Sequence, residues 1–319
     1  ESVLGFKKKG KWYHTLDLTT CLIAPKGTDR LMASIRRWMT AHDLRAWFQK
    51  NNDGLLRYLL VREGKHTGDL MVVLISRTGD IPRDSFVDAV RSAIPATSIY
   101  HATFDGRADA AYMESLTLLA GEDRIQEKLM IDGRELFFSI SPQGFFQTNT
   151  LATQVLYGRI RELVKEIKPA RLYDLYGGSG GIAFSVADLV PSIHSVEEVE
   201  PATLDGRRNA ETNHISNITF ETADVRQYLA QRREMQIAFE PDSAVIVDPP
   251  RAGLHPKVVS HLNALLPPAI IYVSCNPKLL ARELPVFAEN YTIVTMRAVD
   301  LFPHTPHVEC LCLLRLKGE

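Results

Sequence analysis

The sequence RLYDLYGGSGG at residues 171–181 is the stretch that decides the fold. It is an apolar run that ends near an acid and continues into four glycines around one serine. Because glycine has no Cβ, the backbone of such a turn can approach a ligand closely, and a helix that starts there points its free amide groups at that ligand. The stretch therefore predicts a β-strand, a ligand-binding turn and a helix start. Alone it is weak, since glycine-rich turns serve several nucleotide ligands and also plain close packing.

Around this motif, apolar runs alternate with helical segments from about residue 150 onward. A long amphipathic helix is expected at Leu151–Ile167, and helical stretches separate the apolar runs that follow. Such alternation predicts an α/β fold, a parallel sheet with helices on both faces, whose ligands bind at the carboxyl ends of the strands. The runs after the motif are Ile193–Val199, Ile218–Glu221, Ala244–Val247 and Ala269–Ser274.

The first 140 residues have a different pattern. Helices are expected at Asp29–His42 and Asp84–Ile94. Helices interleaved with strands that we expect to be antiparallel predict a compact α+β module, so we predict two domains, residues 1–140 and 141–319. The expected strands of the first domain are Leu55–Arg62, Asp69–Ile75, Ser98–Phe104, Lys128–Ile131 and Glu135–Ile140.

Bulk composition narrows the class of protein. With 45% hydrophobic and 24% charged residues among 319, the chain is typical of a soluble globular protein. No apolar run approaches the roughly 18 residues of a membrane span. Four cysteines, at 21, 275, 310 and 312, make no secreted disulfide framework and favour the cytoplasm. Nothing indicates an obligate dimer, so we expect a monomer.

The net charge of −1 neither favours nor excludes a nucleic-acid partner, because a local basic face is sufficient. Such a face is offered by KKKGK at residues 7–11, within the basic N-terminal segment 1–20. The segment has two interpretations, an exposed solvated turn or a contact to an RNA backbone.

Acidic residues follow the next two predicted strands. Glu200 ends VEEVE, residues 196–200, where a carboxylate can accept both ribose hydroxyls, and Asp224 follows the third strand, where it can accept the amine of an adenine. Each acid alone would more simply cap a helix. Together, after a turn that is not spaced as Gly-x-Gly-x-x-Gly, they predict S-adenosylmethionine rather than a dinucleotide. The same cofactor site is expected to include Asp174, Gly177, Gly178 and Gly180.

The fourth predicted strand ends in DPPRAGL, residues 248–254. The double proline fixes the direction of the backbone and aims Asp248 at the reactive end of the cofactor. Methyltransferases that act on amino groups carry an aromatic residue after a similar Pro-Pro. Arg251 stands there instead, which argues against adenine N6 or cytosine N4 as the acceptor and makes Arg251 a candidate substrate contact. The alternative is an ordinary proline-rich turn.

Cys275 ends the fifth predicted strand, in SCNP at residues 274–277. Most cysteines in apolar strands are core residues, but this one precedes a helix, and a helix N-terminus lowers the pKa of a thiol. A thiolate that adds to uracil C6 makes C5 nucleophilic toward a methyl sulfonium.

The methylated C5 must then lose its proton to a base before the thiol is expelled. Glu309, ahead of the final apolar run Leu311–Leu316, is our candidate, because burial raises the pKa of a carboxyl toward that of a useful proton acceptor. The alternative is a structural, hydrogen-bonded acid. His304 and His307 are expected to be structural, since their spacing gives no complete metal set.

A last cluster, SPQGFFQTN, occupies residues 141–149. Aromatic and amide side chains suit a flipped base, which needs stacking and edge hydrogen bonds. Phe145 and Gln147 are therefore candidates for the pocket. In the alternative interpretation the phenylalanines are core residues and Asn149 caps the following helix, and both interpretations can hold together.

Taken together, FFQTN, DLYGGSG, DPPRAGL, SCNP and PHVE, in this order, resemble the RNA 5-methyluridine methyltransferases, which include 23S ribosomal RNA uridine-C5 enzymes and tRNA T-loop uridine-54 enzymes. The resemblance covers essentially the whole chain and is strongest from Ser141 to Leu316. It implies a class I, Rossmann-like S-adenosylmethionine-dependent methyltransferase domain with a smaller N-terminal α+β domain. It also implies the following roles: Cys275 as nucleophile, Glu309 as acceptor of the C5 proton, Asp248 as a uracil contact, Gln147 and Tyr176 lining the cofactor and base site, and Glu200 and Asp224 holding ribose and adenine.

The form of the motifs favours 23S ribosomal RNA as the substrate, with tRNA as the alternative, and a non-catalytic RNA-binding or RNA-folding protein is a further alternative. Gly177 and Gly181 stand where the family commonly has Cys and Thr. Cys21 matches the fourth ligand of a [4Fe–4S] cluster found in several members. The other three cysteines are absent from these 319 residues, so a cluster is expected only if a longer protein supplies them.

Overall fold

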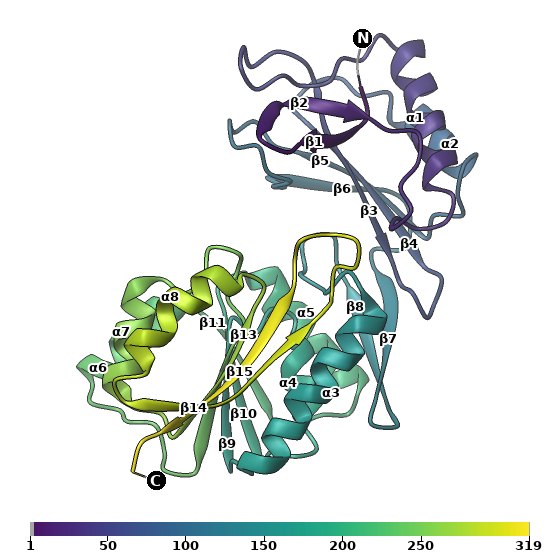
Figure 1. Ribbon diagram of the computed structural model, residues 1–319. Helices are drawn as coiled ribbons and strands as arrows, with labels where there is room; N and C mark the ends of the chain where they lie inside the picture. Colours follow the sequence, from purple (N-terminus) through teal and green to yellow (C-terminus); the bar gives the residue numbers. More distant parts are fainter. Residues whose placement is uncertain (1–2, 319) are drawn as a thin grey trace. The chain divides into compact units, whose positions relative to one another are not determined.

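The computed structural model describes residues 3–318, which form two compact units (Figure 1). The first unit comprises Glu1–Glu127 with Ser141–Gln143, and the second comprises Lys128–Ile140 with Gly144–Glu319. This division differs from the predicted boundary after residue 140, because most of the hairpin of β7 (Ile125–Ile131) and β8 (Arg134–Ile140) packs with the second unit.

Two contacts of the hairpin explain that assignment. The ring of Phe138 lies 5.7 Å from that of Phe184, edge to face, and both side chains are fully buried. The backbone N–H of Ser139 donates to Oδ1 of Asn209 at 2.8 Å. Strand β8 is therefore part of the core of the second unit. Its alternation of apolar and polar residues predicts a half-buried strand, but it does not indicate which of the two units the strand packs against.

The first unit is a four-stranded sheet in the order β3-β4-β5-β6 with two helices. The helices α1 (Thr28–Ala41) and α2 (Arg83–Arg91) bury Leu31, Ile35 and Phe86 in one core with sheet residues. The expectation of antiparallel pairing is wrong for β4 and β5, which are parallel because α2 forms a crossover between them. The strands are β3 (Leu56–Glu63), β4 (Leu70–Ser76), β5 (Ser98–Thr103) and β6 (Ser115–Gly121).

The basic N-terminal segment forms a separate two-stranded antiparallel ribbon, β1 (Gly5–Lys8) and β2 (Lys11–Asp17). Arg36 of α1 fastens its base, because one guanidinium nitrogen donates to the carbonyl of Leu4 at 3.0 Å and to Oδ1 of Asp17 at 2.7 Å. Phe6, 59% exposed, pairs with Leu16, 42% exposed. The ribbon thus presents apolar and basic side chains to solvent.

The second unit has a seven-stranded sheet in the order β11-β10-β9-β12-β13-β15-β14. The strands β9 to β13 are parallel, as predicted, and β15 runs antiparallel to both of its neighbours. Strands β12 and β13 are buried at every residue, which is what parallel strands covered on both faces require. The strands are β9 (Arg171–Leu175), β10 (Ser192–Glu197), β11 (Ile218–Thr222), β12 (Ser243–Val247), β13 (Ala269–Ser274), β14 (Tyr291–Val299) and β15 (Glu309–Leu316).

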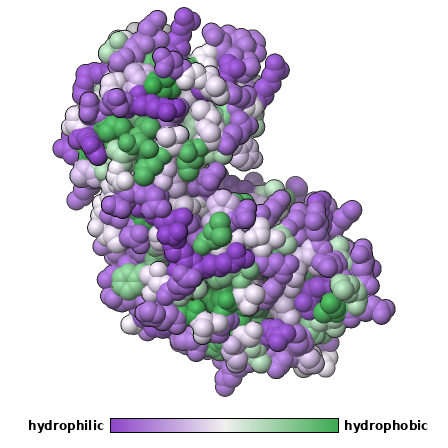
Figure 2. Space-filling view, turned by 180° about the vertical axis from the view of Figure 1, so that it is seen from behind, coloured by the Kyte–Doolittle hydropathy of each residue, from purple (hydrophilic) through white to green (hydrophobic). Residues whose placement is uncertain are grey.

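Helices cover both faces of this sheet (Figure 1), α3, α4 and α5 on one side and α6, α7 and α8 on the other. None of the helices within residues 3–318 is both long and apolar enough to cross a membrane. In the space-filling view, the visible surface of each unit is largely hydrophilic with small apolar patches (Figure 2). The helices are α3 (Thr150–Ile167), α4 (Gly181–Val186), α5 (Glu200–Thr212), α6 (Val225–Glu234), α7 (Pro256–Leu265) and α8 (Pro277–Phe287).

Candidate active site

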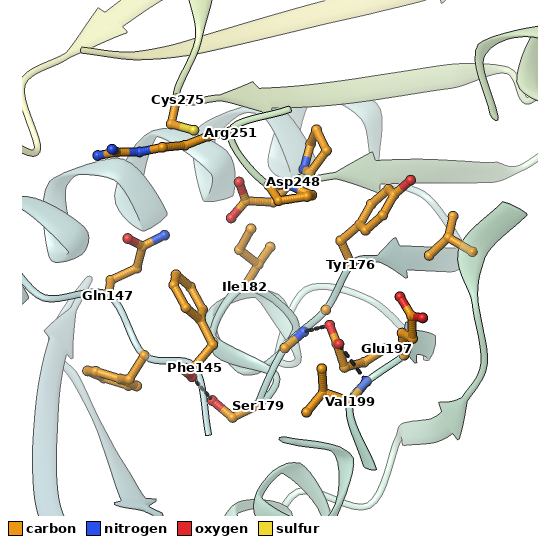
Figure 3. Close-up of a pocket in the computed structure, with 18 of the residues that line it drawn as sticks. Phe145, Gln147, Tyr176, Ser179, Ile182, Glu197, Val199, Asp248, Arg251 and Cys275 are labelled. Carbon is orange, nitrogen blue, oxygen red and sulfur yellow. Dashed lines mark hydrogen bonds between the residues drawn. The ribbon is translucent and has the colours of Figure 1, made fainter. Parts of the chain in front are cut away.

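A cavity of about 730 Å³ opens in the second unit at the carboxyl ends of β9 to β13 (Figure 3). Its volume lies within the range of small-molecule sites, about 300–1,000 Å³. Of the residues predicted for the site, it is lined by Phe145, Gln147, Tyr176, Gly177, Gly178, Asp224, Asp248, Arg251, Cys275 and Glu309. It is not lined by Asp174, Gly180 or Glu200.

The glycine turn after β9 forms the floor of the cavity. A Cβ on Gly177 would lie 2.1 Å from Oγ of Ser195, and a Cβ on Gly181 would lie 2.4 Å from the hydroxyl oxygen of Tyr157. A side chain at either position would therefore require Ser195 or Tyr157 to move. Tyr176 has φ = 66°, a left-handed conformation that is rare for a residue with a side chain and is typical of strained functional turns.

Glu197, the last residue of β10, holds this turn in place. One oxygen of its carboxylate accepts a hydrogen bond from the backbone N–H of Gly178 at 3.0 Å, and the other accepts from Val199 at 2.8 Å. The neighbouring Glu198 also lines the cavity and is exposed. Glu197 and Glu198 therefore both line the cavity, and the carboxylate of Glu197 is bonded to the backbone as well.

The prediction of Glu200 as a cofactor residue is wrong in position. Strand β10 ends at Glu197, two residues earlier than expected, and Glu200 is the first residue of α5, exposed and outside the cavity. Asp224 is in the cavity and also caps α6, because its Oδ1 accepts from the N–H of Gln227 at 2.9 Å. Asp224 therefore caps the helix, and its contact with the adenine of a cofactor stays a prediction.

Asp174 lies beneath the turn, fully buried. Its Oδ2 is 3.0 Å from the position that a Cβ on Gly177 would take. Burial and the charge of Glu197 raise the pKa of Asp174 to about 7. Asp174 thus supports the turn from below. Gly180 is likewise outside the lining, where its neighbours Ser179 and Gly181 stand.

Cys275 and Glu309 are brought together by strand register. Ser274, the last residue of β13, pairs with Cys310 of the antiparallel β15. The next position along places Cys275 opposite Glu309, and side chains at opposed positions of an antiparallel pair point to the same face. Both line the cavity. In Figure 3, Cys275 and Arg251 border one side of the cavity and the carboxylate of Asp248 points into it.

The acids of this corner share a raised proton affinity. Burial raises the pKa of Glu309 to about 7, against the opposing effect of Arg251, which lowers it. Burial, with the charges of Glu309 and Asp174, raises the pKa of Asp248 well above its ordinary value. Groups with such pKa values are suited to exchange protons near neutrality.

The expectation of a lowered thiol pKa at Cys275 is wrong. Burial raises the pKa of this thiol, and the carboxylates of Glu309 and Asp248 raise it further, while Arg251 opposes them. The helix that follows begins only at Pro277, and its effect does not overcome the two acids. The thiol is therefore protonated in the free protein, and a neighbouring group has to accept its proton when it reacts.

Phe145 and Gln147 point into the cavity from the side opposite Arg251 (Figure 3). Phe145 is 59% exposed, and its carbonyl accepts a hydrogen bond from the hydroxyl of Ser179 at 2.9 Å. Phe146 contacts Phe138, with ring centroids 5.1 Å apart. Asn149 caps α3, because its Oδ1 accepts from the N–H of Ala152 at 3.2 Å. Both interpretations of this cluster, pocket and core with cap, therefore apply.

Several residues of the cavity escaped the sequence analysis. Tyr157 faces it from inside a helix, and its apolar helical spacing signals only core. Glu198 was hidden in a run of acids, but Pro201 could have revealed the boundary, since proline favours the first turn of a helix. The other residues of the lining that were not predicted are Phe146, Thr148, Ser179, Gly181, Ile182, Glu197, Val199, Val225, Arg226, Pro249, Pro250, His255 and Phe302.

No group of three or more His, Cys, Asp or Glu side chains within residues 3–318 is arranged to hold a metal ion. Cys21 is in the first unit with a free, partly exposed thiol. A [4Fe–4S] cluster therefore stays a prediction about a longer chain.

The fold and the cavity at the carboxyl ends of β9 to β13 define a class I S-adenosylmethionine-dependent methyltransferase. A solved tRNA m1G37 methyltransferase of M. jannaschii shares this fold at a TM-score of 0.50 and 16% identity, over 83% of this chain and 76% of that one. Residues 101–317 match the family described as tRNA (Uracil-5-)-methyltransferase. The chain belongs to this family and is an RNA uracil-C5 methyltransferase.

Relatives extend the similarity to nearly the whole chain. A tRNA (uracil(54)-C(5))-methyltransferase of Pyrococcus horikoshii is 34% identical over 98% of this chain and 70% of its own length. An uncharacterized RNA methyltransferase of Caldanaerobacter subterraneus is 33% identical over 98% of this chain and 69% of its own length. The crystal structure of the Pyrococcus abyssi tRNA (uracil-54, C5)-methyltransferase, in complex with S-adenosyl-L-homocysteine, superposes with a TM-score of 0.77 at 31% identity, covering 98% of this chain and 72% of that chain.

Proposed function

We propose that this protein methylates C5 of a uridine in a structured RNA through a covalent adduct between Cys275 and uracil C6. The observation that carries the proposal is the register of β13 and β15, which supports a nucleophile and a base on the same face of one sheet, at the rim of the cofactor cavity. Cys275 and Glu309 also line the cavity together with Asp248 and Arg251, which favours a chemical role over packing alone.

The residues of the cavity fit S-adenosylmethionine. The glycine turn leaves its backbone open to the cavity, and Glu198 and Asp224 offer carboxylates where ribose hydroxyls and an adenine amine would need acceptors. When bound, S-adenosylmethionine supplies the methyl group as an electrophilic sulfonium. Glu198 takes the role that we first gave to Glu200.

The chemistry begins with addition of the Cys275 sulfur to C6, while a neighbouring carboxylate accepts the thiol proton. The negative charge that forms on the uracil makes C5 a nucleophile, which would take the methyl group as the bond from the methyl carbon to the sulfonium sulfur breaks and S-adenosyl-L-homocysteine is left. Glu309, with a pKa of about 7, is about half ionised near neutral pH and accepts the proton from C5. The C5–C6 double bond then re-forms and the Cys275 sulfur leaves.

The target base is held by the other side of the cavity. Phe145 offers an exposed ring for stacking, and Gln147 offers an amide to the edge of the uracil. Asp248, which is protonated more readily than an ordinary carboxyl, can donate or accept at the same edge. Arg251 provides a positive charge next to Cys275, which stabilises the thiolate.

The test is a trapping experiment. RNA that carries 5-fluorouridine, with S-adenosylmethionine, should form a stable adduct, since fluorine cannot be removed as a proton. The adduct should be absent in Cys275→Ala and present in Cys310→Ala, a matched control in which the neighbouring, buried cysteine is removed. No adduct with the wild-type protein on RNA that it methylates, or an adduct that persists in Cys275→Ala, would exclude the mechanism. RNA binding without methylation would favour the non-catalytic alternative.

Two RNAs are candidates. The form of the motifs favours 23S ribosomal RNA, whereas the relatives named as tRNA (uracil-54) enzymes support the T-loop of tRNA. Assaying unmodified tRNA and 23S RNA fragments side by side, with mass mapping of 5-methyluridine, decides between them. A uridine-to-cytidine change at the mapped position should abolish incorporation.

The ribbon of β1 and β2 in the first unit is a candidate contact to the RNA backbone. Lys8, Lys9 and Lys11 are exposed, and no salt bridge is found for them within the described residues, whereas Lys7 lies 3.7 Å from Asp109. Exposed Phe6 and Tyr13 accompany them. Lysines interleaved with aromatic side chains are suited to track phosphates and stack on unpaired bases.

A further inference from the structure

A partly buried carboxyl, Glu283, is bonded to the end of the loop that bears Asp248 and Arg251. Glu283 of α8 accepts a hydrogen bond from the hydroxyl of Tyr272, a short contact, and its Oε1 accepts a second from the backbone N–H of Leu254 at 3.2 Å. Tyr272 is fully buried. These two bonds join α8 to β13, which leads to Cys275, and to the loop that carries Asp248 and Arg251.

We propose that Glu283 is a positioning residue, which fixes the Asp248–Leu254 loop against the strand and helix on either side of Cys275 and so sets the place of Arg251. The inference rests on the proposed function, because it concerns the reactivity of Cys275. Glu283 is absent from the cavity lining.

The segments joined by Glu283 converge on the nucleophile. Tyr272 precedes Cys275 by three residues on β13, and α8, which carries Glu283, begins at Pro277. Leu254 ends the loop whose middle residue is Arg251. A displacement of the loop therefore changes the distance between the guanidinium and the thiol, whereas the strand and helix around the thiol are held by the sheet.

The loop is pressed closely onto α8. Gly253 has φ = 75°, and a Cβ there would lie 2.7 Å from Oε1 of Glu283 and 3.3 Å from Cβ of Leu279. In the middle of the loop, Nδ2 of Asn276 donates to the carbonyl of Arg251 at 3.2 Å. The loop is thus hydrogen-bonded to Asn276, the residue after the nucleophile, and to Glu283. Gly253 lies against Glu283, where a side chain would be both strained and crowded.

The consequence is electrostatic. Arg251 is the cation that opposes Glu309 and Asp248 in their effect on the pKa of the Cys275 thiol. If the hydrogen bond between Leu254 and Glu283 is lost, we expect the loop to move and the guanidinium of Arg251 to lie farther from the Cys275 sulfur. Addition to C6 then requires a higher pH, while cofactor binding, which uses the glycine turn on β9, is unaffected.

A double-mutant cycle tests the inference. The rate constant of adduct formation with 5-fluorouridine RNA is measured across pH in the wild type, Glu283→Ala, Arg251→Ala and the double variant. Misplacement of a reacting group by about 1 Å costs roughly a hundredfold, so Glu283→Ala should slow adduct formation by about tenfold to a hundredfold and shift its pH profile to higher pH. In the Arg251→Ala background, Glu283→Ala should have less than a threefold effect.

Controls separate positioning from general destabilisation. Glu283→Gln keeps an acceptor for the backbone N–H of Leu254 and should recover most of the rate of adduct formation. If Glu283→Ala folds poorly, Tyr272→Phe replaces it, because this variant removes one hydrogen bond to Glu283 without leaving a cavity. S-adenosyl-L-homocysteine affinity should stay within twofold. The inference is overturned if the rate loss in the double variant equals the product of the two single losses. It is also overturned if Glu283→Ala leaves the pH profile of adduct formation unchanged. If the wild type itself forms no adduct, the proposed function fails instead.

Discussion

Replacing Glu309 by glutamine should stabilise this protein, and by an amount that depends on pH. The side chain is 3% exposed, and within residues 3–318 its Oε2 has no hydrogen-bond partner. An ionised carboxyl is disfavoured there, which is why its pKa is about 7 in the folded chain rather than the ordinary 4.5. Below pH 4.5 the group is protonated in both the folded and the unfolded states and contributes no pH-dependent cost.

Between pH 4.5 and 7 the folded state binds more protons than the unfolded state, so the free energy of unfolding falls as pH rises. A tenfold change in an ionisation constant corresponds to about 1.4 kcal/mol. Moving the pKa of Glu309 from 4.5 to about 7 therefore costs the folded state on the order of 3 kcal/mol once the group is ionised. Glutamine has nearly the same shape and carries no charge, so it removes this cost.

The assay is urea denaturation of the wild type and Glu309→Gln at pH 5 and pH 8. The variant should gain up to about 3 kcal/mol of unfolding free energy relative to the wild type on going from pH 5 to pH 8. Glu289→Gln, an exposed acid after α8, is the matched control and should show no such difference. A Glu309→Gln effect that is equal at both pH values, or a wild type that is more stable than the variant at pH 8, would refute the reasoning.

Three further outcomes are expected. Glu309→Gln should accumulate a covalent complex with unmodified substrate RNA, seen as a band of reduced mobility on a denaturing gel, because the C5 proton has no acceptor; rapid turnover by this variant would exclude Glu309 as the base. Glu198→Gln should weaken S-adenosyl-L-homocysteine binding by about tenfold in calorimetry, the scale of one charge-assisted hydrogen bond, whereas Glu200→Gln should not change it. The triple variant Lys8→Glu, Lys9→Glu and Lys11→Glu should weaken RNA binding and lower the slope of log K against log salt by about two.

The triple variant needs a control of equal charge. Lys26→Glu, Arg45→Glu and Lys50→Glu reverse three exposed charges elsewhere in the first unit. If this control loses as much affinity as the ribbon variant, the ribbon has no special part in RNA binding. Turnover at saturating RNA should be the same in both variants and the wild type.

Strands that are buried on both faces could be predicted closely from the sequence. The bounds of β13 were predicted residue for residue, because it is a short apolar run that ends in a turn signal. Strand β14 was missed, since an irregularity between Ile293 and Thr295 interrupts its alternation. The parallel pairing of β4 with β5 was missed as well, because local patterns do not report the partner of a strand.

The same contrast holds for the site. Cys275, Asp248 and Arg251 follow strand ends, and strand ends can be found from the sequence. The position of the ribose acid could not be fixed among Glu197, Glu198 and Glu200, because three acids in four residues blur the end of β10. The raised pKa of the Cys275 thiol was beyond the sequence analysis, because it depends on two carboxyls that are distant in sequence.

The place of β15 in the sheet has a consequence for how the protein becomes active. β15 follows β13 and β14 in the chain but lies between them. Until it inserts, β13 has one open edge and β14 has no partner, so folding intermediates expose strand edges that invite aggregation. Glu309 is the first residue of the inserting strand. Closure of the sheet and arrival of the acid beside Cys275 are therefore one event, and under the proposed mechanism the nucleophile and its base come together only when the sheet is complete.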